Sequence, residues 1–215
     1  MANGMGSGNN SGLVYDADEQ IMAAYVQTDW QFNQLEVHAG LRAEHTEQGY
    51  AIDPVAAAAN RTDLSGRQNY LDFFPSVSLK YLFTDNNQLR ASYFKGISRP
   101  GFFEIVPTIR SAGGGDSFYS ERGNPDLRPA IGHSFDLRFE RFPNTLDQIL
   151  VGVFYKRLIN PIEYGFPIPD GVENQNTRPN VSRILPQNFG VANNLGLELD
   201  YTKYIRNFGV RFNYS

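Results

Sequence analysis

The feature that most constrains this chain is an alternation of apolar and polar residues that recurs along most of its length. Within residues 34–48 every second side chain is apolar, and most of the side chains between them are polar or charged. Successive side chains of a β-strand point to opposite faces, so this division predicts a strand with one face in an apolar medium and the other in a polar medium. Similar stretches predict seven more strands, at residues 20–30, 71–83, 131–142, 147–159 and 189–205, from residue 87 to the Arg99–Pro100 step, and from Phe208 onward.

The connections between these stretches alternate in length. Short turns follow the first, third, fifth and seventh stretches, and long connections at 49–69, 100–129 and 160–187 follow the others. In an antiparallel meander this places every short turn at one end and every long loop at the other, which is typical of transmembrane outer-membrane β-barrels. A soluble β-sandwich also alternates polar and apolar faces, but it does not require this asymmetry. We therefore predict an all-β fold, an antiparallel meander of about eight strands that is part of a transmembrane outer-membrane β-barrel.

Composition excludes several other classes of protein. The chain of 215 residues has a net charge of −4 and no cysteine. A nucleic-acid-binding surface would be strongly basic, and disulfides, thiolate zinc sites and cysteine nucleophiles need cysteine, so we expect none of these. The sequence contains no catalytic constellation and no pair of metal ligands, which predicts a protein that is not an enzyme and has no cofactor. Residues 1–19 are expected to be a flexible leader, followed by one β-barrel segment over residues 20–215.

Two motifs resemble those of TonB-dependent receptors of the bacterial outer membrane. The first is a strand that ends at Arg99-Pro100 before a long loop, and the second is Gly-Asn-Pro-Asp-Leu-Arg-Pro at residues 123–129. Shorter stretches at 39–44, 74–78 and 195–199 support the resemblance in the same order along the chain. Glycine permits the bend and each proline restrains the backbone before it, so we expect the motifs to shape the entry from loop to strand. The residues predicted to have this structural role are Arg99, Pro100, Gly123, Asn124, Pro125, Leu127 and Pro129.

The resemblance implies a barrel of about 22 strands, plugged by an N-terminal domain, that actively imports a scarce nutrient such as a siderophore, glycan or peptide. Its expected partners are outer-membrane lipid, the plug domain, an inner-membrane energy-coupling complex and the nutrient, with no nucleic acid. This chain contains only about eight strands and no plug, so we interpret it as a central segment of such a barrel in the bacterial outer membrane. Large apolar groups exposed on a loop often mark a binding surface, which makes four aromatic residues candidates for ligand contact: Phe102, Phe103, Phe118 and Tyr119.

Two other interpretations remain open from the sequence. Eight strands can close on themselves, so the chain could form a complete small outer-membrane barrel with a structural or adhesive role. It could also form a soluble β-sandwich that acts as a binding module. In each case we expect the charged residues of the polar faces to pair across neighbouring strands, with each pair worth up to about 1 kcal/mol.

Overall fold

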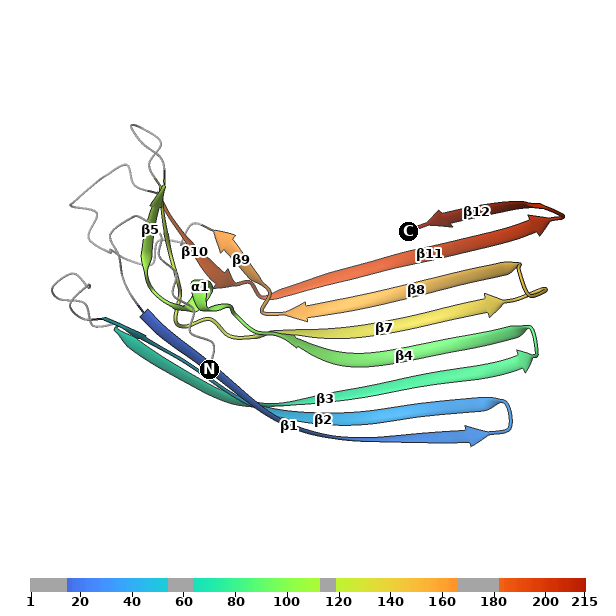
Figure 1. The fold of residues 1–215 in the computed structure, drawn as a ribbon, viewed down its shortest axis with the longest axis horizontal. Helices are drawn as coiled ribbons and strands as arrows, with labels where there is room; N and C mark the ends of the chain where they lie inside the picture. Colours follow the sequence, from blue (N-terminus) through green and yellow to red (C-terminus); the bar gives the residue numbers. More distant parts are fainter. Residues whose placement is uncertain (1–14, 54–63, 113–118, 166–181) are drawn as a thin grey trace.

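In the computed structural model, which describes residues 15–53, 64–112, 119–165 and 182–215, the chain forms one long antiparallel sheet with a smaller sheet at one end (Figure 1). The order in the large sheet is β1-β2-β3-β4-β7-β8-β11-β12, so each strand pairs with the previous long strand. The expected all-β antiparallel meander is confirmed. Its strands are β1 (Tyr15–Phe32), β2 (Leu35–Ile52), β3 (Ser65–Thr84), β4 (Asn87–Ser98), β7 (Ala130–Arg141), β8 (Gln148–Ile159), β11 (Val191–Ile205) and β12 (Phe208–Tyr214).

Three strands, β1, β2 and β3, extend further at the loop end than the sequence pattern predicted. β1 begins at Tyr15, inside the segment expected to be a flexible leader, and its ladder with β2 runs from the pair Tyr15 and Ile52. Residues 15–19 of the expected leader are thus part of β1, and residues 1–14 lie outside the described part of the chain. The strand extends this far because Tyr15 and Ala17 pack on a small apolar core at this end, which the local alternation does not reveal.

The loop end contains ordered structure that was expected to be irregular. A helical turn, α1 (Phe102–Ile105), follows β4, and a four-stranded sheet has the order β5-β6-β10-β9. Figure 1 shows this small sheet and α1 together at the loop end. Among the described residues no helix has the length and apolar character needed to cross a membrane. The four strands are β5 (Ile109–Ala112), β6 (Tyr119–Arg122), β9 (Ile162–Gly165) and β10 (Ser182–Asn188).

The register of the large sheet aligns the apolar positions of all its long strands on one face. One row of directly paired residues crosses seven strands and contains only apolar side chains. Many of them are exposed, which suits a surface that faces lipid. The opposite face carries the charged residues. The apolar row consists of Trp30, Val37, Leu79, Ala91, Leu137, Val153 and Leu197.

The large sheet is open, and β1 and β12 form its two edges without pairing with each other. A closed eight-stranded barrel would pair these two strands, so the structure differs from that alternative. A β-sandwich would place a second sheet face to face with the first, whereas the small sheet lies at one end. The open, curved sheet instead has the form of a sector of a wider barrel.

The buried apolar core lies at the loop end and not between two layers of sheet. Tyr50 and Ile52 at the end of β2 contact Ile105, Val106 and Leu127 from the connection between β4 and β7. We call these five residues the loop-end core. Along the rest of the sheet, hydrogen-bonded ladders and the apolar face determine the architecture, as expected where the surrounding lipid replaces a protein core.

Candidate functional site

The two family motifs, about 20 residues apart in sequence, meet beside α1. The backbone N–H of Asn124 donates to the carbonyl oxygen of Glu104 at 2.6 Å. A Cβ atom at Gly123 would overlap the carbonyl group of Val106, so only glycine fits between the two segments. Leu127 is 1% exposed within the loop-end core. The motifs therefore form one compact unit at the base of the long loop.

Side-chain amides hold this unit on the large sheet and on the small one. Gln48 of β2 donates to the carbonyl oxygen of Pro100 at 2.9 Å, and Gln68 of β3 donates to that of Pro125 at 2.6 Å. Asn124 donates to the carbonyl oxygen of Pro186 in β10 at 3.0 Å.

Asn188 connects the second motif to β10. Its amide nitrogen donates to the carbonyl oxygens of Arg128 and Asn160 at 2.8 and 2.9 Å, and its oxygen accepts from the Arg128 N–H at 2.8 Å. Pro129 follows, and β7 begins at the next residue. The roles of Gln48, Gln68 and Asn188 were not predicted, because a hydrogen bond to a distant backbone group leaves no periodic signal in the sequence.

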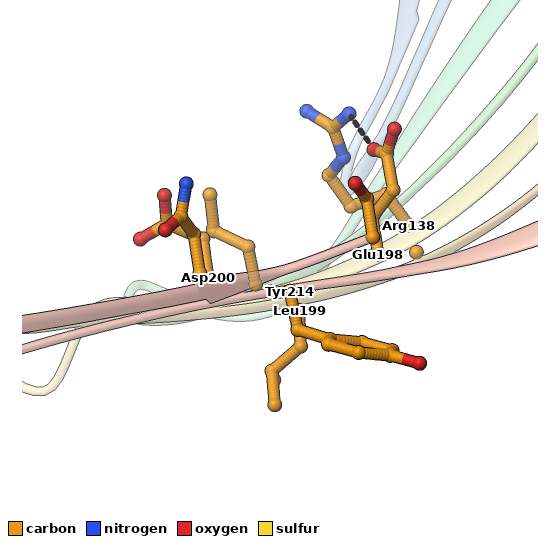
Figure 2. Close-up of a pocket in the computed structure, with 9 residues that line it drawn as sticks. Arg138, Glu198, Leu199, Asp200 and Tyr214 are labelled. Atoms are coloured by element: carbon orange, nitrogen blue, oxygen red, sulfur yellow. Dashed lines mark hydrogen bonds and ion pairs between the residues drawn. The ribbon is translucent and has the colours of Figure 1, made fainter.

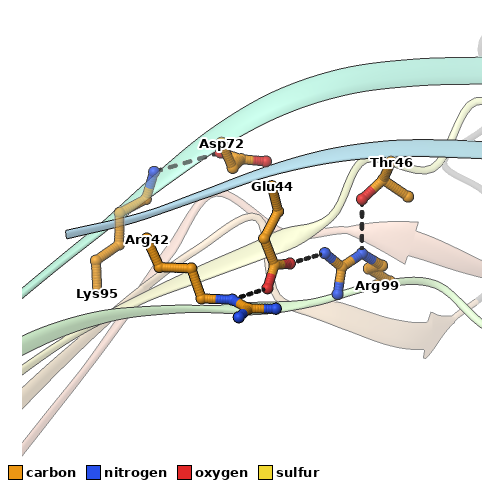
Figure 3. Close-up of polar contacts among 6 residues, drawn as sticks. All are labelled: Arg42, Glu44, Thr46, Asp72, Lys95 and Arg99. Carbon is orange, nitrogen blue, oxygen red and sulfur yellow. Dashed lines mark hydrogen bonds and ion pairs between the residues drawn. The ribbon is translucent and has the colours of Figure 1, made fainter. Parts of the chain in front are cut away.

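Arg99 joins the first motif to the polar face of β2 (Figure 3). Its guanidinium forms an ion pair with Glu44 and donates to the Thr46 hydroxyl at 3.1 Å. Arg42 donates to the other oxygen of Glu44 at 2.5 Å, so the carboxylate lies between two guanidinium groups. The side chains of Glu44 and Arg99 are 11% and 18% exposed, whereas that of Arg42 is 46% exposed. This triad fixes the base of the loop and presents one cation on the polar face.

The four aromatic residues predicted to contact a ligand do not occupy equivalent places. Phe102 is half-buried and packs on the loop-end core, so it contributes to the fold of α1. Phe103, the next residue, is 58% exposed. Tyr119 lies in β6, and Phe118 lies outside the described residues. Of the two α1 aromatics, Phe103 presents the larger surface.

The expected cross-strand pairing of charges is present on the polar face. Lys80 lies 3.1 Å from Glu36 on the neighbouring strand, and Arg90 lies 3.1 Å from Glu140. Such partly exposed pairs each contribute at most about 1 kcal/mol, so they maintain a polar wall more than they stabilise the fold. Within the described ranges, no group of three or more histidine, aspartate or glutamate side chains could hold a metal ion.

Two hollows lie on the large sheet among the described residues. The hollow in Figure 2, of about 310 Å³, is lined by Glu198 and Asp200 from one face and by Leu199 and Tyr214 from the other. This hollow lies at the edge of the sheet, beside β12. The second hollow, of about 370 Å³, lies on the polar face. Small polar residues and an aspartate–histidine pair contribute to its lining: Ser76, Ser78, Ser92, Asp29 and His38.

A protein-family model described as the outer membrane protein beta-barrel family matches residues 7–214, nearly the whole chain. No curated protein matches the sequence significantly. Among solved structures, the siderophore receptor PirA from Pseudomonas aeruginosa has 12% identity and a TM-score of 0.60 over 93% of this chain and 43% of that receptor. The hemophore receptor HasR of Serratia marcescens, solved with its hemophore HasA and heme, has 16% identity and a TM-score of 0.67 over 91% and 33%. The ferric enterobactin receptor PfeA from Pseudomonas aeruginosa, solved with enterobactin, has 16% identity and a TM-score of 0.61 over 94% and 36%.

The family match places the protein in the bacterial outer membrane, and the similar structures confirm the receptor-barrel fold that the two motifs indicated. They also agree with the expectation of a non-enzymatic protein. The chain spans less than half the length of each of these three receptors. By its match over residues 7–214, the chain belongs to the outer membrane protein β-barrel family, with the fold of a section of a receptor barrel.

Proposed function

We propose that this chain forms a sector of the barrel wall of a TonB-dependent receptor that takes up a scarce nutrient across the bacterial outer membrane. The observation that carries the proposal is the division of the sheet into an apolar face that crosses the strands and an opposite, charge-paired face. In a barrel, the first face contacts lipid and the second lines a polar lumen. The small sheet and α1 lie at the loop end, and this additional structure supports an assignment of the loop end to ligand recognition.

In this proposal the nutrient is a siderophore, glycan or peptide that is recognised at the loop end. Phe103 is the leading candidate for contact because it is exposed on α1, whose base is fixed by Arg99 and by the loop-end core. Phe102, Phe118 and Tyr119 remain candidates as neighbouring loop aromatics. The polar face would surround a plug domain, and energy would come from an inner-membrane complex that acts on the complete receptor.

Uptake by the complete receptor in living cells tests this function. The panel of radiolabelled compounds would contain ferric siderophores, heme, an oligosaccharide and a peptide, each measured with and without the proton gradient of the inner membrane. We expect gradient-dependent uptake of one class, and Phe103→Ala should weaken its binding about tenfold through lost apolar contact. Phe208→Ala is the matched control, because Phe208 is 80% exposed at the turn end. Uptake that does not depend on the gradient would refute the proposed function.

A further inference from the structure

A row of polar side chains interrupts the apolar face close to the loop end and continues to Lys95 of β4, which pairs directly with His133. His133 of β7 pairs directly with Arg157 of β8, and Arg157 pairs directly with Asn193 of β11. On both sides of this row the equivalent positions carry large apolar side chains. The turn-side row contains Phe135, Tyr155 and Leu195, and the loop-side row contains Ile131, Ile159 and Val191.

Two tyrosine hydroxyl groups orient the side chains of His133 and Asn193. The Tyr93 hydroxyl lies 3.0 Å from Nδ1 of His133, which leaves Nε2 as the ring nitrogen open to a ligand. The Tyr155 hydroxyl donates to Oδ1 of Asn193 at 2.7 Å. The Asn193 oxygen thereby accepts one hydrogen bond, and its amide N–H groups remain to donate. His133 and Asn193 are thus held in place by hydrogen bonds that leave donor-capable groups open.

Arg157 lies between them and supplies a permanent positive charge. Its side chain is exposed, and within the described residues it has no ion-pair or hydrogen-bond partner. Lys95, at the β4 end of the row, pairs with the Asp72 carboxylate at 3.3 Å, and no carboxylate is present at the β7, β8 and β11 positions of this row or of the two apolar rows beside it. A guanidinium group on a lipid-facing surface is costly in the hydrocarbon and nearly free of cost at the headgroup level. The row therefore requires an anion or an interfacial position.

The aromatic residues beside the row mark that interfacial position. The rings of Tyr93 and Phe135 lie 4.8 Å apart, and those of Phe135 and Tyr155 lie 6.1 Å apart, which makes an aromatic band across β4, β7 and β8. Outer-membrane barrels carry such bands where the hydrocarbon meets the headgroups. A cation and two oriented polar groups directly on the loop side of the band lie at the depth of lipid phosphate.

We propose that His133, Arg157 and Asn193 bind a phosphate group of a membrane lipid on the outer surface of the barrel. Arginine binds phosphate through two parallel hydrogen bonds, and the neighbouring histidine and asparagine add donors from either side. A lipid fits better than free phosphate because Val191 and Leu195, on either side of Asn193, are 50% and 72% exposed and would be covered by an acyl chain. This site goes beyond nutrient uptake and does not depend on which nutrient is taken up.

Native mass spectrometry of the complete receptor tests the site by counting the lipids that remain bound. The two probes are phosphatidylglycerol and a diacylglycerol with the same acyl chains. We expect retention of phosphatidylglycerol alone, and about fivefold weaker binding after Arg157→Gln, the change that loss of one cation near an anionic surface produces. Tyr155→Phe keeps the ring in the aromatic band but removes the hydroxyl that orients Asn193, and it should also weaken retention.

Arg138→Gln is the matched control, because Arg138 belongs to the polar face of the same sheet and pairs with Glu198 at 3.4 Å. Equal losses of phosphatidylglycerol in Arg138→Gln and Arg157→Gln would overturn the site, as would equal retention of diacylglycerol. Displacement of the lipid by inorganic phosphate at a similar concentration would overturn the assignment to a lipid and indicate a site for soluble anions. If Arg157→Gln fails to fold, unchanged retention in folded Tyr155→Phe overturns the proposal.

Discussion

Replacement of Leu127 by alanine tests whether the loop-end core holds the two motifs together. Leu127 is 1% exposed and packs with Val106 and Ile105, which are 1% and 4% exposed. Replacing a buried leucine with alanine costs about 2–5 kcal/mol, because apolar contact is lost and a cavity remains. The core is small and lies at the end of the sheet, so we expect this cost to appear as local opening of α1 and the second motif, while the long ladders stay intact.

Hydrogen exchange of the complete receptor, followed by mass spectrometry, measures this opening. The reporter is the backbone N–H of Asn124, which donates to Glu104 across the two motifs. A loss of at least about 2 kcal/mol corresponds to exchange about thirtyfold faster or more. The matched control is Leu146→Ala, because Leu146 is 59% exposed in the turn between β7 and β8 and its truncation should change stability by less than about 0.5 kcal/mol. Exchange of the Asn124 amide within about twofold of wild type in Leu127→Ala would refute the reasoning.

Three further predictions concern backbone fit, ion pairing and pH. Gly123→Ala should lower the free energy of unfolding, measured in urea, by about 1–3 kcal/mol because the new Cβ meets a carbonyl group. Gly96→Ala has open space around its Cβ position and should leave the free energy of unfolding almost unchanged. Equal losses in the two variants would contradict the close contact at Gly123. Arg99→Gln should lower the free energy of unfolding by about 2 kcal/mol because a mostly buried carboxylate loses one of its two guanidinium partners, and an unchanged value would show that the pair is dispensable. The hydrogen bond from Lys203 holds the pKa of the Asp147 carboxyl below its usual range. At pH values above the usual aspartate pKa the ionised carboxylate therefore stabilises the turn, and this stabilisation is lost as the pH falls through the lowered pKa. The difference in Tm between wild type and Asp147→Asn should therefore shrink below about pH 4, and a difference that grows there would contradict the sign.

The long strands could be predicted from the sequence because each carries its own evidence. Residues 34–48 alternate so regularly that the start of β2 was predicted to within one residue. The turn before Phe208 was predicted at the position where β11 ends, Ile205. A strand with one lipid-facing side is specified residue by residue, since every second position must tolerate hydrocarbon. The largest errors lie at the loop end, where β1 begins at Tyr15 and not at residue 20, and β3 begins at Ser65 and not at residue 71.

The candidate site could be predicted only in part. The motif residues from Gly123 to Pro129 were identified by resemblance, yet their partners Gln48, Gln68 and Asn188 were not. Each partner acts through one side-chain amide that reaches a backbone carbonyl far away in sequence. Any polar residue at the end of a strand could make such a bond, so the sequence carries no signal that distinguishes the ones that do.

The sequence by itself determined the strands, their polar and apolar faces, and the end at which the long connections lie, because these follow from local periodicity and turn chemistry. Tertiary structure alone decided that the connections fold into α1 and a second sheet, and that Gly123 packs against Val106. It also decided that His133, Arg157 and Asn193 form one row across three strands. The physical reason is register: pairing between strands brings together residues that are far apart in sequence, and the alternation within one strand does not encode what its neighbour places opposite.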